Sequence, residues 1–171
     1  MKLFKQSAKH SIKFFLNGNQ VEGFAEPNLL LSDFLRKEIG ATGTHVGCEH
    51  GICGACTVKL DGEAIRACLC LAIQVEGRDV VTIEGLADTE GSLGIIQKAF
   101  HENFALQCGF CTPGFLTTLD HYLKINPTPT EKELREVYSG NMCRCTGYDE
   151  IIRASLEAAN ELLKIKTLNL K

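Results

Sequence analysis

Nine cysteines constrain this chain more than any other feature, because eight of them fall into two groups of four. The first group follows the spacing Cys-x4-Cys-x2-Cys and adds one cysteine further along the chain: Cys48, Cys53, Cys56 and Cys68. The second group joins a Cys-x2-Cys pair to a Cys-x-Cys pair: Cys108, Cys111, Cys143 and Cys145. Four thiolates at the first spacing are the plant-type ligand set of a [2Fe–2S] cluster. We therefore expect a protein that moves single electrons.

The bulk properties exclude several other classes of protein. An odd number of cysteines argues against a disulfide framework, and a reducing compartment disfavours one. The basic first residues lead into no apolar stretch, and no apolar run is long enough to cross a bilayer, so we expect a cytoplasmic protein without a membrane span. A formal charge of -3 and the lack of a Lys/Arg cluster argue against a nucleic-acid partner.

The first half of the chain is predicted to form a small α+β domain of the β-grasp type. Asn17-Gly18 between two strand-like runs is a strong hairpin signal. A helix is expected over residues 28–39, with Gly40 at its end, because apolar residues recur there at helical spacing. Residues 42–56 are expected to form a loop that carries three of the cysteines. The predicted strands are 11–16, 20–25, 57–60, 63–66 and 79–83.

The second half is predicted to be all-helical, with its cysteines in the turns between helices. Thr130 stands three residues before Glu133, which is the pattern of a capping box at the start of a helix. The predicted helices are 93–104, 114–125, about 131–138 and 148–164. The domain boundary is placed near Ala87–Ser92. This gives a ferredoxin-like domain over residues 9–86 and a four-helix [2Fe–2S]-binding domain over residues 87–166.

The residues around the first four cysteines favour iron and sulfide over other metal sites. Glycines are interleaved with these cysteines, and they let backbone N–H groups approach a cluster closely: Gly43, Gly47, Gly51 and Gly54. Cys48-Glu49-His50 has the Cys-x-His form of a Rieske centre. No second Cys/His pair accompanies it, so His50 is expected to be a loop side chain.

The spacing of the second group leaves zinc open, because structural zinc also uses four cysteines in two close pairs. Cys108-x2-Cys111 suits zinc, and Cys143-x-Cys145 is tight for it. The ninth cysteine, Cys70, matches no ligand position. Its apolar neighbours predict a buried thiol that serves in core packing.

Five short motifs resemble the two cluster domains of the xanthine oxidase family of molybdenum hydroxylases. Those of the first domain are Thr-Gly-Thr-His-Val-Gly-Cys at 42–48, Cys-Gly-Ala-Cys-Thr-Val at 53–58 and Asp-Gly at 61–62. Those of the second domain are Gln-Cys-Gly-Phe-Cys-Thr-Pro-Gly at 107–114 and Gly-Asn-Met-Cys-Arg-Cys-Thr-Gly-Tyr at 140–148. The resemblance runs from about Ser11 to Lys164 and leaves the first ten residues outside. The second pair of motifs is specific enough to disfavour zinc.

The resemblance implies a role for each group of cysteines. The first four are expected to bind the cluster farther from molybdenum, and the second four the nearer one. In the family, the glutamine before the first cysteine of the helical domain and the last cysteine of the Cys-x-Cys pair lie against the pterin. Gln107 and Cys145 occupy these positions, and a side-chain amide can hydrogen-bond to a pterin edge.

The resemblance also implies partners, because two cluster domains occupy nearly the whole chain. The chain resembles the small subunit of a heterotrimer, with a large molybdopterin-binding subunit and a medium FAD-binding subunit, as one trimer or as a dimer of trimers. Such a complex oxidises an aldehyde, an N-heteroaromatic ring or a similar small substrate, and this chain is expected to carry electrons without catalytic residues. The loops at Gln107 and 143–148 are expected to lie against the large subunit.

Two other classes of function are compatible with the same cysteines. One is a free-standing two-cluster ferredoxin-like electron carrier, although the chain lacks the strong acidic bias that many docking ferredoxins have. The other is a module in which zinc or clusters serve as structure or as a redox sensor. Visible absorbance separates clusters from zinc, and co-purifying molybdenum separates a subunit from a free carrier.

Overall fold

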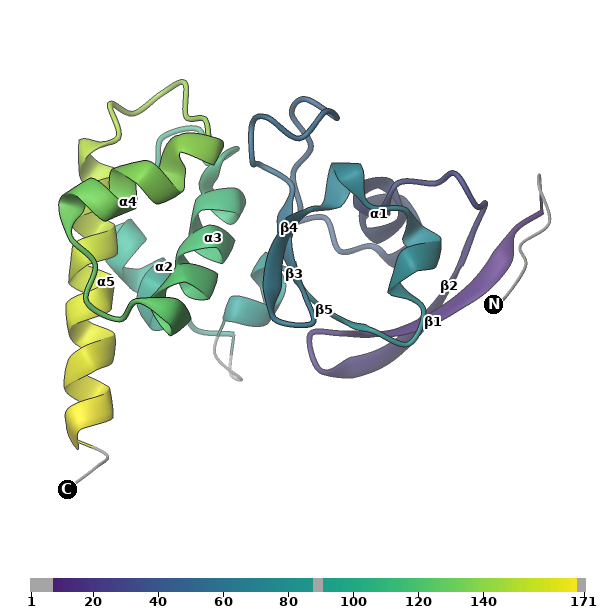
Figure 1. Ribbon diagram of the computed structural model, residues 1–171, viewed down its shortest axis with the longest axis horizontal. Coiled ribbons are helices and arrows are strands. Elements are labelled where there is room, and N and C mark those ends of the chain that lie inside the picture. Colours follow the sequence, from purple (N-terminus) through teal and green to yellow (C-terminus); the bar gives the residue numbers. More distant parts are fainter. Residues whose placement is uncertain (1–7, 88–90, 169–171) are drawn as a thin grey trace.

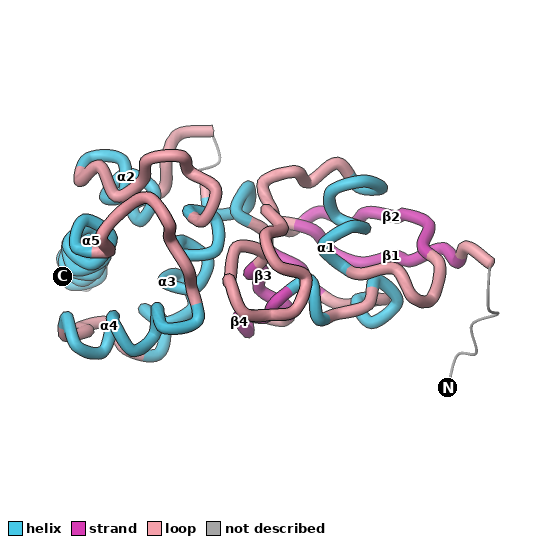
Figure 2. The backbone as a smooth tube through the Cα atoms, turned by 90° about the horizontal axis from the view of Figure 1, so that it is seen from above, coloured by secondary structure: helices cyan, strands magenta, loops and turns pink. Residues whose placement is uncertain are grey.

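The computed structural model describes residues 8–87 and 91–168, and its two halves lie side by side (Figure 1). The sheet lies in one half and helices α2 to α5 in the other (Figure 2). Each half has its own buried core, which confirms the predicted α+β class. The predicted boundary at 87–92 includes residues 88–90, which lie outside the described residues. Within the described ranges, no helix is both long and apolar enough to cross a membrane.

The first half is built on a five-stranded sheet in the order β2-β1-β5-β3-β4. Strands β1 and β5 run parallel, and the other neighbours run antiparallel. The strands are β1 (His10–Leu16), β2 (Asn19–Ala25), β3 (Thr57–Leu60), β4 (Glu63–Arg66) and β5 (Asp79–Val81). Asn17 and Gly18 both have positive φ, as a two-residue hairpin turn requires, so the predicted first hairpin is confirmed.

The helix expected over residues 28–39 begins later than predicted. Helix α1 (Leu31–Asp33) continues as a π-helix, η1 (Phe34–Ile39), and ends at Gly40, whose φ of 86° is left-handed. Leu29 and Leu30 do not join the helix because they pair with the segment after Cys68. The amide of Ala72 donates to the carbonyl of Leu29 (2.8 Å), and Leu30 forms a β-bridge with Leu71. Helical periodicity could not show this long-range pairing.

The last strand is also shorter than predicted, because it ends at Val81 instead of residue 83. The amide of Thr82 donates to Oδ1 of Asn17 (2.9 Å), which turns the chain out of the sheet. A 3-10 turn, η4 (Ile83–Leu86), follows, and both of its end residues pack against the helical core. This turn therefore carries the chain from one half to the other.

The second half contains the four predicted helices with small changes at their ends. They are α2 (Ile95–Glu102), α3 (Thr112–Ile125), α4 (Glu131–Val137) and α5 (Asp149–Leu168). Thr130 and Glu133 form the predicted capping box, with the amide of each bonded to the side chain of the other. Helix α5 begins one residue later than predicted, because Tyr148 has a φ of 71°, outside the helical region. Short 3-10 turns complete the chain: η2 (Ala67–Leu69), η3 (Ala72–Val75) and η5 (Tyr138–Gly140).

The two halves meet where α3 packs against β3. The Lys59 ammonium pairs with Asp120 there, and the Lys59 side chain is only 6% exposed. Burial lowers the pKa of Lys59, while the Asp120 carboxylate opposes that effect. The backbones also come very close, because a Cβ built on Gly114 would lie 2.1 Å from the carbonyl oxygen of Gly54. Only glycine allows this approach.

We expect Gly54→Ala to destabilise the contact between the two halves. Gly54 has a φ of 73°, and an added Cβ would lie 2.5 Å from the carbonyl oxygen of Gly140. Gly18→Ala is the matched control, because Gly18 has a φ of 81° with no atom within 4 Å of its added Cβ. Both variants carry a left-handed strain of about 1–2 kcal/mol. Thermal unfolding should show a larger loss for Gly54→Ala, and equal losses would contradict the proposed clash.

Candidate metal centres

The first four predicted ligands come from a long loop and from one end of a β-hairpin. Cys48, Cys53 and Cys56 lie on the loop between η1 and β3, while Cys68 lies in turn η2 after β4. The β3–β4 ladder continues past its last pair, because the amide of Ala67 donates to the carbonyl of Cys56 (3.1 Å). This ladder brings Cys56 and Cys68 together across the hairpin.

The second four come from the two loops at one end of the helical half. Cys108 and Cys111 lie in the turn before α3, and Cys143 and Cys145 lie in the loop before α5. The Sγ atoms of Cys108 and Cys145 are 3.3 Å apart. Four thiols that are distant in sequence are thus placed around one end of the bundle.

In both groups the thiols meet in pairs. The side chains in contact are Cys48 with Cys53, Cys56 with Cys68, Cys108 with Cys145, and Cys111 with Cys143. Among residues 8–87 and 91–168, no three His, Cys, Asp or Glu side chains converge as ligands of a single metal ion. A [2Fe–2S] cluster has two irons, each bound by two of the four protein ligands. Two thiol pairs in each group therefore fit a binuclear cluster.

Within the first group, the surroundings lower the pKa of one thiol and raise that of another. Hydrogen bonding from the backbone of Cys53 lowers the pKa of Cys48 to about 6, with a further contribution from the backbone of His50. Burial raises the pKa of Cys56 to about 11. The backbone N–H of Cys68 opposes that effect, and the Cys68 thiol adds to it. Four thiolates cannot accumulate here without a compensating cation, and a bound metal deprotonates its thiol ligands outright.

The second group shows the same division. The backbone N–H of Phe110 lowers the pKa of Cys108, whereas burial raises the pKa of Cys111 to about 12. Burial acts to raise the pKa of Cys143 as well, but hydrogen bonds from Thr146, the Cys145 backbone and the Cys111 side chain together leave the pKa lowered. The hydroxyl and the amide of Thr146 donate to Sγ of Cys143 at 3.1 and 3.4 Å.

The two cysteine loops are joined to each other across the interface between the halves. The amide of Met142 donates to the carbonyl of Cys53 at 2.9 Å. The ring of His45 stacks on Phe110 with centroids 4.9 Å apart, and its Nδ1 is 2.8 Å from the Phe110 carbonyl oxygen. Both loops lie along the same upper edge of the molecule in Figure 1. The two candidate centres are therefore neighbours on one edge of the molecule.

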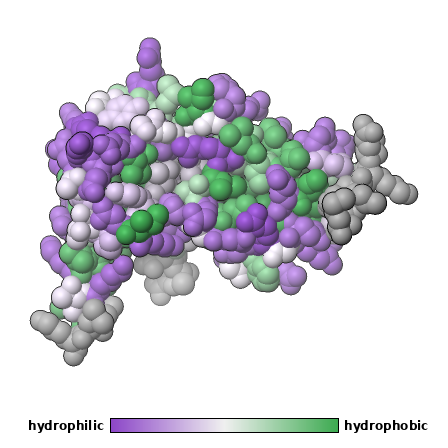
Figure 3. All heavy atoms as spheres, viewed as in Figure 1, coloured by the Kyte–Doolittle hydropathy of each residue, from purple (hydrophilic) through white to green (hydrophobic). Residues whose placement is uncertain are grey.

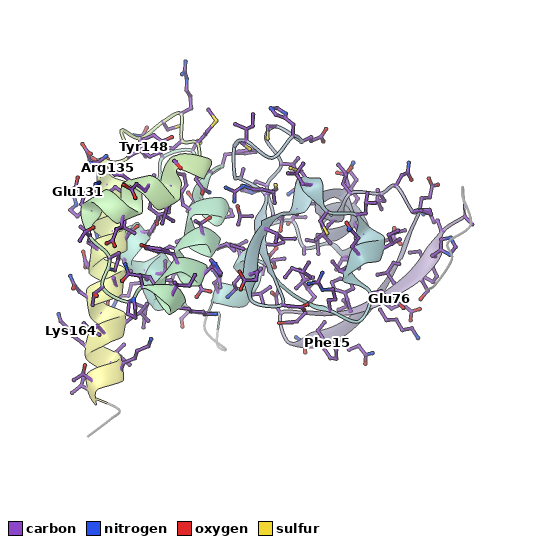
Figure 4. The ribbon with its side chains drawn as sticks, in the orientation of Figure 1. Phe15, Glu76, Glu131, Arg135, Tyr148 and Lys164 are labelled. Carbon is purple, nitrogen blue, oxygen red and sulfur yellow. The ribbon has the colours of Figure 1, made fainter. Side chains whose placement is uncertain are left out.

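The hydroxyl of Tyr148, just before the start of α5, helps to position the loop that carries Cys143 and Cys145. The amide of Cys143 donates to Oη of Tyr148 at 2.9 Å, and that hydroxyl lies 3.4 Å from the carbonyl oxygen of Asn141. Figure 4 shows Tyr148 beside Arg135 at the upper end of the helical half. Tyr148 thereby braces the backbone of a predicted ligand, a role that the sequence motif alone did not show.

The second group lies at the surface, among exposed apolar side chains. Cys108, Cys145 and Gln107 are all exposed, and Gln107 directly precedes the Cys108–Cys145 pair. Exposed apolar residues belong to the same two loops, and we call them the apolar rim: Phe104, Leu106, Phe110 and Met142. Exposed apolar side chains that lie close together are typical of a contact with another protein. On the face drawn in Figure 3, hydrophobic spheres gather mainly over the sheet half.

The remaining sequence predictions concern single residues. Cys70 is buried in the first core, as predicted, with its Sγ 3.6 Å from the Leu71 carbonyl oxygen. His50 is an exposed loop side chain whose ring contacts the Cys48 carbonyl, also as predicted. Sequence reasoning missed Thr146 and Arg66. The position of Thr146 within Cys-Arg-Cys-Thr-Gly-Tyr was the signal that could have found it.

Comparison with known proteins adds independent findings. The profile of the 2Fe-2S iron-sulfur cluster binding domain matches residues 14–80, and that of the [2Fe-2S] binding domain matches residues 82–156. Caffeine dehydrogenase subunit gamma from Pseudomonas sp. (strain CBB1) is 51% identical, over 94% of this chain and 99% of that protein. The small subunit of nicotine 6-hydroxylase from Paenarthrobacter nicotinovorans is 47% identical, over 86% of this chain and 88% of that one.

A solved structure agrees with these relatives. Quinoline 2-oxidoreductase from Pseudomonas putida 86 contains a chain that superposes with a TM-score of 0.88 and is 45% identical. The match covers 92% of this chain and 98% of that one. Two [2Fe–2S] domains in this order, with relatives of matching length, establish the family. The chain belongs to the small iron–sulfur subunits of the xanthine oxidase family of molybdenum hydroxylases.

Proposed function

We propose that this chain is the electron-transfer subunit of a molybdenum hydroxylase. It relays single electrons from a molybdopterin site on a large subunit, through two [2Fe–2S] clusters, to FAD on a medium subunit. The clusters supply one-electron redox chemistry when bound. The protein supplies the ligands, their spacing and the surrounding hydrogen bonds. The first four cysteines would hold one cluster, and the second four would hold the other.

One observation carries this proposal: a backbone hydrogen bond joins the two ligand loops beside predicted ligands of both groups. Cys53 is a predicted ligand of the first cluster, and its carbonyl accepts from Met142, the residue before the predicted ligand Cys143. A few covalent bonds and one hydrogen bond thus connect the two groups of thiols. A short connection of this kind suits electron transfer between two clusters in one chain better than it suits two clusters with separate structural roles.

The proposed large subunit would dock on the apolar rim. Gln107 and Cys145 lie exposed beside it, so their side chains are available to a pterin held by the partner. Phe104 is 80% exposed and Met142 is 57% exposed, which leaves apolar surface for a permanent interface to bury. This favours a subunit over a freely exchanging carrier, whose exposed surface would stay in water.

The proposed medium subunit would dock beside the first group of thiols. Ile52 and Leu69 are both exposed there, and Leu69 packs against Gly51 of the cysteine loop. These two side chains flank predicted ligands, Cys53 and Cys68, on the sheet half of the chain. A partner placed there would receive electrons from the first cluster without contact with the apolar rim.

We also propose that the complex acts on an N-heteroaromatic ring. Three similar proteins are named for caffeine, nicotine and quinoline, and all three compounds contain a nitrogen-bearing aromatic ring. The substrate would bind to the large subunit, so this chain would have no catalytic residue. None of the described cysteines forms a disulfide, which fits a reducing compartment, and we propose the cytoplasm.

The metal and flavin content of the native complex tests the whole proposal. We expect about four irons per chain. Near-stoichiometric molybdenum and FAD should co-elute on two larger subunits when the tagged chain is purified from its host. Four irons without molybdenum or partners would instead indicate a free electron carrier. Zinc in place of iron would refute both.

Gln107→Ala and Cys145→Ser should both impair electron transfer from substrate to flavin. Gln107→Ala removes an amide that is free to hydrogen-bond to a pterin, and Cys145→Ser weakens a predicted ligand. Stopped-flow reduction of the flavin by substrate is the measurement. Gln20→Ala, an exposed glutamine at the far edge of the sheet, is the control. Full rates in both variants would defeat the assignment of these two residues.

Thr146→Val should lower the reduction potential at the second group of thiols. The Thr146 hydroxyl donates to Sγ of Cys143, and such hydrogen bonds stabilise the more negative, reduced form of a cluster. We expect a shift on the order of tens of millivolts, since ~59 mV is a tenfold change for a one-electron couple. A redox titration followed by electron paramagnetic resonance measures it. Thr167→Val, on the last turns of α5, should leave both potentials unchanged.

A further inference from the structure

Arg66 crosses the interface between the two halves and joins the segments that carry both sets of predicted ligands. It is the last residue of β4 and lies half-buried. Its Nη1 donates to Oγ1 of Thr57 at 2.5 Å, and its Nη2 donates to the carbonyl oxygen of Gly140 at 2.6 Å. The planar guanidinium can make two such bonds at once, whereas a lysine cannot reproduce this geometry.

The two acceptors are close in sequence to predicted cluster ligands. Thr57 directly follows Cys56, and Gly140 precedes Cys143 by three residues. Arg66 itself stands two residues before Cys68. One side chain therefore links the hairpin end that holds Cys56 and Cys68 to the loop that leads into Cys143.

The surrounding contacts hold the Arg66 guanidinium and its two acceptors in place. The Thr57 hydroxyl donates to the carbonyl of Gly54 (2.6 Å), and Nδ2 of Asn141 lies 3.4 Å from that same oxygen. A Cβ built on Gly140 would lie 2.8 Å from Nη2 of Arg66, so glycine is needed for the guanidinium to approach. The network thereby fixes the position of the positive charge.

No carboxylate among the described residues neutralises the charge of Arg66. Both of its acceptors are uncharged oxygens, and within the described residues no acidic side chain forms an ion pair with it. Arg78 and Arg135, by contrast, are paired with carboxylates. A half-buried cation keeps more of its long-range field than an exposed, paired one.

We propose that Arg66 is a positioning residue that locks the two ligand loops together and raises the reduction potentials of both centres. This inference rests on the proposed function, because it requires a cluster at each group of thiols. A cluster becomes more negative on reduction, so a nearby uncompensated cation stabilises its reduced form. The same side chain would hold the distance between the centres constant.

The test uses the full chain with its co-purifying subunits, as wild type, Arg66→Gln, Arg66→Lys and Arg78→Gln. Arg66→Gln removes the charge. Arg66→Lys keeps the charge but cannot make the two simultaneous hydrogen bonds to Thr57 and Gly140. Arg78→Gln is the matched control, because it removes the same charge from an exposed ion pair in the same half. Redox titration followed by electron paramagnetic resonance gives each potential and the magnetic splitting between the two reduced centres.

We expect Arg66→Gln to lower the ratio of reduced to oxidised centres about tenfold at a fixed ambient potential, a shift of ~59 mV. Arg66→Lys should restore most of the potential but not the magnetic splitting, which depends steeply on the distance between the centres. Arg78→Gln should match wild type in both.

Other outcomes would overturn the proposal. The electrostatic role would be refuted if Arg66→Gln shifted the reduction potentials no more than Arg78→Gln does. It would also be refuted if Arg66→Lys shifted them as much as Arg66→Gln. A wild-type splitting in both Arg66 variants would remove the positioning role. If both Arg66 variants lost iron while wild type and Arg78→Gln kept it, Arg66 would instead be required for cluster assembly. Absence of four irons from wild type would refute the electron-relay function itself, and this inference with it.

Discussion

The hydrogen bond from the Met142 amide to the Cys53 carbonyl joins two domains that each have a separate hydrophobic core. Domains with separate cores are free to move relative to each other unless their interface is extensive or closely fitted. Here the fit is close, because Gly54 and Gly114 bring the two backbones into direct contact. The separation between the two groups of thiols depends on this contact, and the proposed electron relay requires that separation to be constant.

The close approach of the thiols is a second constraint, because it limits how stable the chain can be without bound metal. Burial, with a further contribution from neighbouring thiols, raises the pKa of Cys56 and Cys111, while backbone amides lower that of Cys48 and Cys108. The protein therefore places thiols that ionise readily beside thiols that ionise only when a metal is bound. Such an arrangement costs stability in the metal-free chain, and metal binding would offset that cost.

Much of the fold could be predicted from local patterns. Asn17-Gly18 with its flanking strands, the glycine stop at Gly40 and the capping box at Thr130 are all present. These signals are local because turns and caps depend on the backbone conformations of a few adjacent residues. The errors lie at Leu29–Leu30 and Thr82, where pairing with residues far along the chain replaced the locally expected helix and strand.

For the candidate site, the sequence by itself determined which side chains could bind a cluster, because thiolate chemistry and cysteine spacing depend on residue type and order. It also determined the family, through motifs that are specific over short lengths. Only the tertiary structure decided how the eight thiols pair, and that Arg66 and Thr146 reach across to the ligand segments. Those contacts join residues far apart or depend on one side-chain orientation, and local propensity carries no information about either.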